Sequence, residues 1–372
     1  MATITVEERQ AFRDSIRRLL AERSTEKDVR RTMEIDAGYD PALWQQLAEL
    51  GTVGLLIDPA HGGVGAGPME LELVMEEVGA ALLCSPLLSS GVLAAGLIAA
   101  LGDEAAAARL LPGIADGSRI ATAALTGPDG TWTESGVAVT ATASGDNWTL
   151  DGTARFVTHG HVADTLLAAA RTPSDGVQIF EVDPKAAGVT ATRLPSFDRT
   201  LRLADIGFTC VPGLRLKTSA PAWAAVDRAL SLALVALAGE QAGAAKRVLE
   251  MTVDYAKTRV QFGRAIGSFQ AIKHMAANLL LEAESAISAA RNAARALAEE
   301  AADAPAAVSL AAFACADAFV TVAADAIQMH GGIAFTWEHP AHLYFRRARA
   351  DAQLFGTPAF HRERFIQHLE GG

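Results

Sequence analysis

The stretch YAKTRVQFGRAIGSFQ, residues 255–270, says most about the fold of this chain. A long run of helix-forming residues precedes it, and Gly263 and Gly267 interrupt the pattern shortly after Lys257. Glycine commonly follows a helix, and cations suit a helix's carboxyl end. The pattern therefore predicts a long helix that ends near Lys257 and a tight turn after it.

The same stretch contains the residue types of a ligand-binding site. Arg259, Gln261 and Arg264 cluster beside the apolar Phe262 and two glycines. Guanidinium groups bind phosphate through paired hydrogen bonds, and glycine lets a ligand approach the backbone closely. The spacing leaves two interpretations open: the cations only complement a helix end, or they bind a phosphorylated ligand.

A second informative stretch is IQMHGGIAFTWEHP, residues 327–340. A helix stops there at a double glycine, and an aromatic and acidic segment follows. His330, Glu338 and His339 lack the spacing of metal ligands on one helix face, so no metal site is expected.

Composition changes character twice along the 372 residues. Apolar residues recur at helical spacing up to about residue 115, short strands bounded by turn residues follow, and long helices return after Pro221. At a prior of about 150 residues per domain, two or three domains are expected. The predicted boundaries are 1–116 for a helical domain, 117–215 for a β-domain and 216–372 for a second helical domain.

Charge and hydropathy exclude several classes of function. The net charge of −11 argues against a general nucleic-acid or anionic-membrane binder. The most apolar stretch, residues 230–238, is short and ends in Gly239 and Glu240. It predicts a buried helix, so no membrane insertion is expected.

The cysteines and the amino-terminal residues indicate in which cellular compartment the protein is expected. Cys84, Cys210 and Cys315 are too few and too scattered for a disulfide framework or a zinc site. The first residues lack a basic start followed by an apolar core, so no signal peptide is expected. These features predict a protein of the reducing cytoplasm.

The stretches at 255–270 and 327–340 together strongly resemble the acyl-CoA dehydrogenases. Residues 42–67 resemble that family's amino-terminal domain, and residues 110–128 resemble its entry into the β-domain, so the resemblance covers the whole chain. It implies an all-α amino-terminal domain, a central β-barrel or sandwich, and a carboxyl-terminal four-helix bundle. The helix–strand–helix order above agrees with this fold.

The resemblance implies an acyl-CoA substrate and an FAD cofactor held where two subunits meet. Arg259 and Phe262 occupy the family positions that contact the pyrophosphate and adenosine of the FAD in the neighbouring subunit. Gln328, Gly331 and Gly332 match the remaining contacts on the adenosine side. These five residues form what we call the donated half-site.

Three further residues match positions that contact the subunit's own flavin, and we call them the own half-site. Phe156 and Thr158 form the family's aromatic-x-Thr segment against the flavin ring, and Thr158 is expected to help hold the flavin edge that accepts hydride. Thr357 belongs to the Gly-Thr pair near the carboxyl terminus.

The catalytic base of the family is missing from both of its usual positions. The reaction needs a carboxylate to remove the α-proton of the thioester while hydride leaves for the flavin. The glutamate before the Gly-Thr pair is replaced by Phe355, and the alternative position on the preceding helix is Ala233. Glu240, about two helical turns after Ala233, is a substitute candidate, although a buried carboxylate paired with Arg247 or another cation is the simpler interpretation.

The own half-site departs from the family pattern elsewhere too. The family's Thr-Glu-Pro-x-x-Gly-Ser-Asp loop corresponds to residues 125–130, with Gly127 in place of the glutamate. Ala359 stands where a flavin-contacting glutamine is common. The own half-site therefore looks eroded, whereas the donated half-site looks intact.

This asymmetry resembles the base-less subunit of actinobacterial α2β2 acyl-CoA dehydrogenases, several of which act on CoA thioesters of steroid side chains. The leading hypothesis is accordingly a subunit that completes the FAD site of a paralogous, base-bearing partner. One alternative is a self-sufficient homotetramer with an unassigned base such as Glu240. Another is different flavin oxidation chemistry, or a scaffold without flavin, on the same fold.

Overall fold

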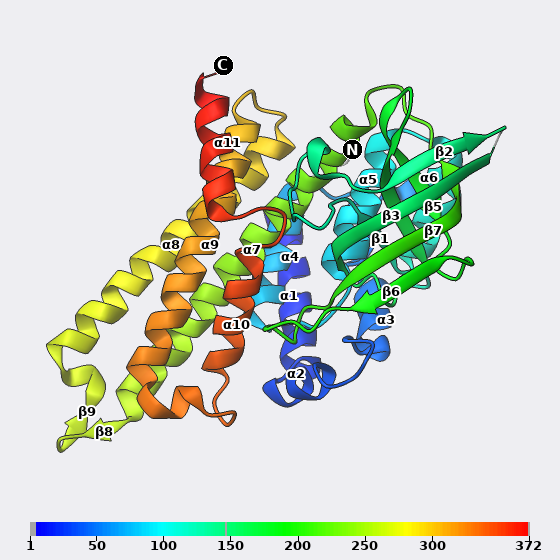
Figure 1. The fold of residues 1–372 in the computed structure, drawn as a ribbon. Helices are drawn as coiled ribbons and strands as arrows, with labels where there is room; N and C mark the ends of the chain where they lie inside the picture. Colours follow the sequence, from blue (N-terminus) through cyan, green and yellow to red (C-terminus); the bar gives the residue numbers. More distant parts are fainter. Residues whose placement is uncertain (1–4, 146, 371–372) are drawn as a thin grey trace. The chain divides into compact units, whose positions relative to one another are not determined.

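The computed structural model describes residues 5–145 and 147–370. Helices come first, strands second and helices last, as the sequence pattern predicts (Figure 1). The first four residues, part of the segment on which the expected lack of a signal peptide rests, lie outside the described residues. The three domain boundaries stay predictions.

The chain forms two compact units that do not follow the sequence order. One unit comprises Thr32–Gly67 and Cys84–Ala233. The other comprises residues 5–31, Pro68–Leu83 and residues 234–370. The amino-terminal helices are thus shared between the two units.

The first unit contains short helices and a sheet that closes on itself. Strand β5 pairs with both β7 and β4, so β4, β2, β3, β7 and β5 complete a barrel, while β1 pairs with β4 and β6 pairs with β7. The helical elements are α3 (Pro41–Glu49), η1 (Pro59–His61), η2 (Leu87–Ala94), α5 (Ala95–Leu101), α6 (Glu104–Ala115) and η3 (Glu134–Gly136). The strands are β1 (Ala121–Ala124), β2 (Thr140–Ser144), β3 (Asn147–Thr158), β4 (Thr165–Thr172), β5 (Gly176–Val182), β6 (Val189–Arg193) and β7 (Leu203–Arg215).

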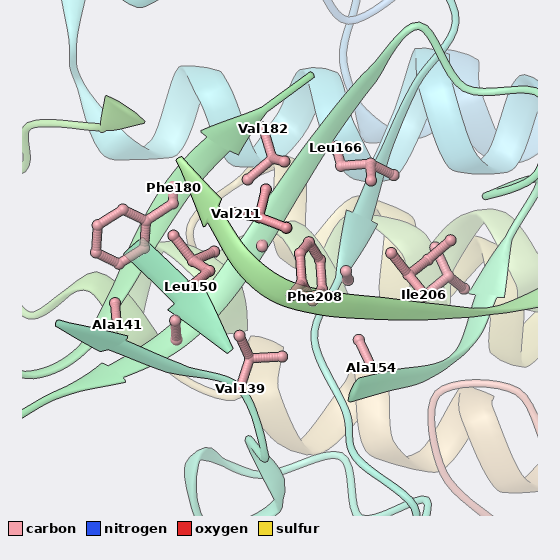
Figure 2. Packing of buried hydrophobic residues seen from close by; sticks show 14 of the residues in the cluster. Val139, Ala141, Leu150, Ala154, Leu166, Phe180, Val182, Ile206, Phe208 and Val211 are labelled. Atoms are coloured by element: carbon pink, nitrogen blue, oxygen red, sulfur yellow. The ribbon is translucent and has the colours of Figure 1, made fainter. Parts of the chain in front are cut away.

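The interior of this barrel is filled by small and branched side chains around two phenylalanines. Phe180 and Phe208 lie among aliphatic residues from the neighbouring strands (Figure 2). Their labelled neighbours in Figure 2 are Val139, Ala141, Leu150, Ala154, Leu166, Val182, Ile206 and Val211. This packing fixes the strand ends from which the own half-site residues Phe156 and Thr158 project.

The second unit is helical apart from one small hairpin. Its helices α8 and α9 run side by side, and α10 and α11 both contact α9 (Figure 1). The elements are α1 (Val6–Arg23), α2 (Glu26–Thr32), α4 (Pro68–Ala80), most of α7 (Ala222–Thr258), β8 (Val260–Gln261), β9 (Arg264–Ala265), η4 (Ile266–Ser268), α8 (Gln270–Ala298), α9 (Ala304–His330), η5 (Gly331–Phe335), α10 (Ala341–Asp351) and α11 (Pro358–Glu370).

Glycines let α4 and α7 approach until their backbones touch. A Cβ atom on Gly79 would lie 1.9 Å from the carbonyl oxygen of Glu240, and one on Gly243 would lie 1.9 Å from the carbonyl oxygen of Glu76. Gly239 meets the carbonyl oxygen of Glu72 in the same way, at 2.7 Å. No other residue fits at these positions without moving a helix.

Helices α7 and α9 are long and apolar enough to cross a membrane by length and composition alone. In each, however, 67% of the most apolar window is buried inside the protein. A mostly buried core helix of a soluble protein has this character.

Helix α4 buries four carboxyl groups, and arginines from other helices neutralise three of them. Glu70 pairs with Arg9 at 2.7 Å. The remaining pairs are Glu76 with Arg13 and Arg291, and Glu77 with Arg13 and Arg17. Burial and the nearby Glu76 carboxylate raise the pKa of the fourth, Glu72, to about 9, so its carboxyl is protonated at neutral pH.

The raised pKa of Glu72 predicts a pH-dependent stability. Because the folded state holds this proton up to about pH 9 while the unfolded chain releases it near 4.5, the free energy of unfolding falls as pH rises between these values. The variant Glu72→Gln lacks this loss and is expected to be more stable than the wild type at alkaline pH. Urea unfolding at about pH 6 and about pH 9 measures the difference.

The exposed Glu282 on α8 provides the control, because Glu282→Gln is expected to keep the wild-type pH dependence. An equal fall in stability for Glu72→Gln and the wild type between the two pH values contradicts the prediction.

Candidate functional site

The segment after α7 forms a projecting hairpin. Strands β8 and β9 pair across a turn in which Phe262 and Gly263 both have left-handed backbone angles, with φ of 51° and 76°. The amide of Ile266 donates to the carbonyl of Arg259 at 2.8 Å and closes the base of the hairpin. The predicted helix end and turn are therefore confirmed.

The hairpin presents its two site residues to solvent. The Phe262 side chain is 93% exposed and touches Phe269 edge to face, with ring centroids 6.2 Å apart. No described residue forms an ion pair or side-chain hydrogen bond with the exposed Arg259. Arg264 instead lies over the Phe269 ring, 4.0 Å from its centroid. An unpaired guanidinium beside an exposed aromatic ring suits a ligand that is both anionic and aromatic.

The double-glycine segment adds accessible backbone. Helix α9 ends at His330, and Gly331 turns the chain with a φ of 67°. A Cβ atom on either Gly331 or Gly332 would meet nothing within 4 Å. Gln328, one turn earlier, is exposed. A ligand can thus reach the backbone of this turn directly.

Stacked rings bring the hairpin and the double-glycine segment together. Tyr255, in the last turn of α7, lies over His330 with ring centroids 4.5 Å apart, and His339 lies on His330 at 4.3 Å. His330 donates from Nδ1 to the carbonyl of Ala326 at 2.7 Å. Burial lowers the pKa of His330 and of His339, so both rings are neutral at neutral pH. These ring contacts connect the last turn of α7, which precedes the hairpin, to the end of α9, which precedes the double glycine.

Within residues 5–145 and 147–370, no three His, Cys, Asp or Glu side chains are arranged to hold a metal ion.

In the first unit, Phe156 lies at an irregularity of strand β3. The pairing register with β7 shifts between Ala154 and Val157, and Phe156 between them has a φ of 56°. Its ring lies against Gly130, where a Cβ atom would be 3.3 Å away, and the Arg155 guanidinium lies 5.2 Å from the ring centroid. Because of this bulge, the Phe156 side chain does not follow the regular alternation of side-chain directions along the strand.

Thr158, two residues later, has a buried hydroxyl that no described residue hydrogen-bonds. Its carbonyl accepts a hydrogen bond from the Thr122 hydroxyl at 2.7 Å. The Oγ1 atom of Thr158 is buried and has no hydrogen-bond partner among the described residues. Buried hydroxyls are normally bonded, so this one fits a contact with a bound group.

The loop at 125–130 excludes the family's glutamate by shape. A Cβ atom on Gly127 would lie 2.5 Å from the Cβ of Ala138 and 3.0 Å from the carbonyl oxygen of Gly136. The amide of Gly127 donates to that same carbonyl at 2.9 Å. The loop is thus closed against residues 136–138 of the same chain, at the position where the family resemblance places a functional glutamate.

The two positions that the family resemblance assigns to the catalytic base are both buried and apolar. Phe355 is 2% exposed, with a φ of 60°, and Ala233 is fully buried on α7. Thr357 is exposed, and its hydroxyl accepts the amide of Phe360 at 3.2 Å at the start of α11. One hydroxyl of the own half-site therefore caps a helix.

Glu240 lies in a buried ion-pair network rather than in an open site. Its carboxylate pairs with Arg347 of α10, and the Nε atom of Arg347 lies 3.0 Å from Oδ1 of Asp351. All three side chains are buried. Arg347 is thus a cation that pairs with Glu240, in agreement with the expected pairing with Arg247 or another cation, and the arrangement favours a structural role for Glu240.

The structure adds one residue that the sequence did not single out. His361 of α11 is buried, and its Nε2 would lie 2.9 Å from a Cβ atom on Gly356, next to the base position. Burial, with the nearby Arg364 cation, lowers the pKa of His361 to about 4. In the sequence, only the position of His361 four residues after Thr357 could have pointed to this residue.

Comparison with known proteins identifies the family. The amino-terminal domain of the acyl-CoA dehydrogenases matches residues 6–118, and their carboxyl-terminal domain matches residues 223–369. The acyl-CoA dehydrogenase IpdE2 of Mycolicibacterium smegmatis is 35% identical over 95% of this chain and 96% of its own. IpdE2 of Mycobacterium tuberculosis is 36% identical over 95% of this chain and 94% of its own.

Solved structures agree over the whole length. A variant of the Tcur3481–Tcur3483 steroid ACAD is 30% identical, with a TM-score of 0.88 and 98% of each chain covered. The ChsE4–ChsE5 complex from Mycobacterium tuberculosis is 28% identical, with a TM-score of 0.90 and 100% of each chain covered. The predicted fold is confirmed, and the chain belongs to the acyl-CoA dehydrogenase family of FAD-dependent oxidoreductases.

Proposed function

We propose that this chain is the subunit of a heteromeric acyl-CoA dehydrogenase that lacks the catalytic glutamate. It completes the FAD site of a paralogous, base-bearing partner in an α2β2 assembly. The observation that carries the proposal is the contrast between Phe355, buried at the base position, and the outward-facing Arg259 and Phe262.

The residues of the donated half-site fit the distal part of FAD. The unpaired Arg259 guanidinium would hold the pyrophosphate, and the exposed Phe262 ring would contact the adenosine. The open backbone at Gly331 and Gly332, with the exposed Gln328, would complete the adenosine contacts. When bound, FAD supplies the acceptor for the hydride that leaves the β-carbon of the acyl-CoA.

The chain's own residues offer no base at either family position. A benzyl or methyl side chain cannot take the α-proton, and losing a general base costs about 10²–10⁴-fold in rate. The closed loop at Gly127 further removes a polar contact from the own half-site. A partner that brings the glutamate therefore supplies what this chain lacks.

The relatives support a heteromeric assembly and suggest a substrate class. One structural neighbour is the ChsE4–ChsE5 complex, and another is a variant of a steroid ACAD. We include in the proposal a CoA thioester of a steroid side chain as substrate and a location in the cytoplasm, where scattered free cysteines are typical.

A self-sufficient homotetramer is the second candidate. The unpartnered hydroxyl of Thr158 favours it, because that atom belongs to the chain's own half-site. In that enzyme Glu240 is the candidate base, although its pairing with Arg347 leaves its charge already compensated. Other flavin chemistry, or a scaffold without flavin, is the third.

Expression of the chain alone and together with its operon neighbour separates these candidates. The proposal predicts that the co-expressed complex binds FAD and oxidises acyl-CoA, whereas the isolated chain does neither. The flavin absorbance spectrum and acyl-CoA turnover of each preparation measure this. Tight FAD binding and acyl-CoA turnover by the isolated chain would contradict the heteromeric proposal.

The variant Arg259→Ala is expected to weaken FAD retention in the complex by about tenfold or more, because a charge-assisted contact with phosphate is lost. Dilution followed by flavin fluorescence measures the FAD that is released. Arg18→Ala, which removes an exposed arginine from α1, is the control and is expected to retain FAD fully. Equal release from both variants contradicts the role of Arg259.

The ion-pair network around Arg347 gives a prediction about stability. Arg347→Met leaves Glu240 and Asp351 buried without their cation and is expected to cost about 3–5 kcal/mol in free energy of unfolding. Glu240→Gln removes one charge and is expected to cost less while leaving turnover of the complex unchanged. Urea unfolding and turnover measure the two effects. A loss of turnover with normal stability in Glu240→Gln would instead identify Glu240 as the base.

A further inference from the structure

Three pairs of adjacent residues in the first unit are connected by three hydrogen bonds. Together with the peptide bond inside each pair, these hydrogen bonds close a ring, which we call the buried ring. The pairs are residues 89–90 in η2, residues 121–122 at the start of β1, and residues 158–159 at the end of β3. The bonds are Ala121 N to Ser90 Oγ at 3.0 Å, Thr122 Oγ1 to the Thr158 carbonyl at 2.7 Å, and His159 Nδ1 with Ser89 Oγ at 3.3 Å.

The buried ring connects elements that the sheet leaves unconnected. Strand β1 pairs with β4, and β3 pairs with β2 and β7, so no ladder joins β1 to β3. All six residues of the ring are buried. Element η2 is a π-helical turn, a rare conformation that occurs frequently at functional sites. Two successive hydroxyls of this turn thus reach two different strands.

The direction of the bond between Ser89 and His159 follows from the proton count. The Ser89 hydroxyl donates its one proton to the carbonyl of Pro86 at 3.0 Å. His159 must therefore donate from Nδ1 to Ser89 Oγ, which selects one tautomer of the neutral imidazole. The imidazole thus connects η2 to the end of β3 through this hydrogen bond.

His159 also holds an unfavourable backbone turn. Its φ is 53°, a left-handed value that few residues other than glycine adopt, although histidine does so more often than most. Its amide donates to the carbonyl of Arg202 at 2.9 Å. Fixing the backbone directly after Thr158 limits where the stiff threonine side chain can place its hydroxyl.

We propose that Ser89 and His159 are positioning residues. Through the buried ring they hold Thr158 so that its otherwise unpartnered hydroxyl faces a flavin bound at the end of β3. This inference rests on the second candidate under the proposed function, since it takes the bound group to be a flavin in the chain's own half-site, and it does not depend on the donated half-site. Neither residue touches the flavin itself.

The test uses the flavin-loaded protein, in whichever assembly retains FAD. Ser89→Ala and His159→Ala are expected to raise the Kd for FAD about 3- to 10-fold and to shift the visible flavin spectrum in the same direction as Thr158→Val. His159→Asn is expected to restore both values, because asparagine tolerates a left-handed backbone and its amide can donate to Ser89.

Ser309→Ala is the matched control. Ser309 is a buried serine of α9 whose hydroxyl donates to the carbonyl of Pro305 at 2.9 Å, so its loss tests the cost of a buried hydroxyl alone. It is expected to leave the flavin spectrum unchanged. His159→Asn keeps the test decisive if Ser89→Ala does not fold, since a shifted spectrum in this variant overturns the proposal.

The outcomes separate this inference from the proposed function. A spectral shift in Thr158→Val without one in Ser89→Ala or His159→Ala overturns the positioning role and leaves the flavin contact standing. An unchanged spectrum in Thr158→Val overturns the inference altogether. In either case, loss of FAD in Arg259→Ala still supports the donated half-site.

Discussion

Neutralisation of the buried carboxylates of α4 is the interaction on which the second unit depends. Arginines of α1 and α8, far from α4 in sequence, must lie against it, because an uncompensated buried charge is costly. The glycine contacts with α7 then bring the helix that ends in the Arg259 hairpin to a fixed distance from α4. The buried ion pairs of α4 thus help to position the surface residues of the donated half-site. Glu72 remains protonated among these ion pairs, so the buried region gains no further negative charge.

The two half-sites differ in how they are built. The donated half-site consists of side chains and glycine backbone turned to solvent. The own half-site is closed by shape at Gly127 and by an apolar side chain at Phe355, yet Thr158 keeps a buried hydroxyl without a protein partner among the described residues. On the proposals made above, the chain has lost the proton-abstracting part of a site while the buried ring still positions the Thr158 hydroxyl toward a flavin.

The sequence predicts what depends on local pattern and fails where distant residues meet. The end of α7 and the turn at Phe262 follow from glycine and charge spacing, and the helix–strand–helix order follows from periodicity. The pairing of Glu240 with Arg347 joins residues from different helices, and no local signal distinguishes Arg347 from Arg247 as the partner. The exclusion of a side chain at Gly127 and the ring through Ser89 depend on backbone approach, which residue types do not encode locally.

Two exposed aromatic rings of the second unit have a consequence for how such a protein is produced. Phe262 is 93% exposed and Phe335 is 80% exposed, and water solvates such apolar rings poorly. Under the proposed function, chains made in excess of a partner would leave these rings uncovered and would tend to bind chaperones or one another. A cell would then gain from matching the synthesis of this chain to that of its partner, and shared transcription is the simplest means of doing so.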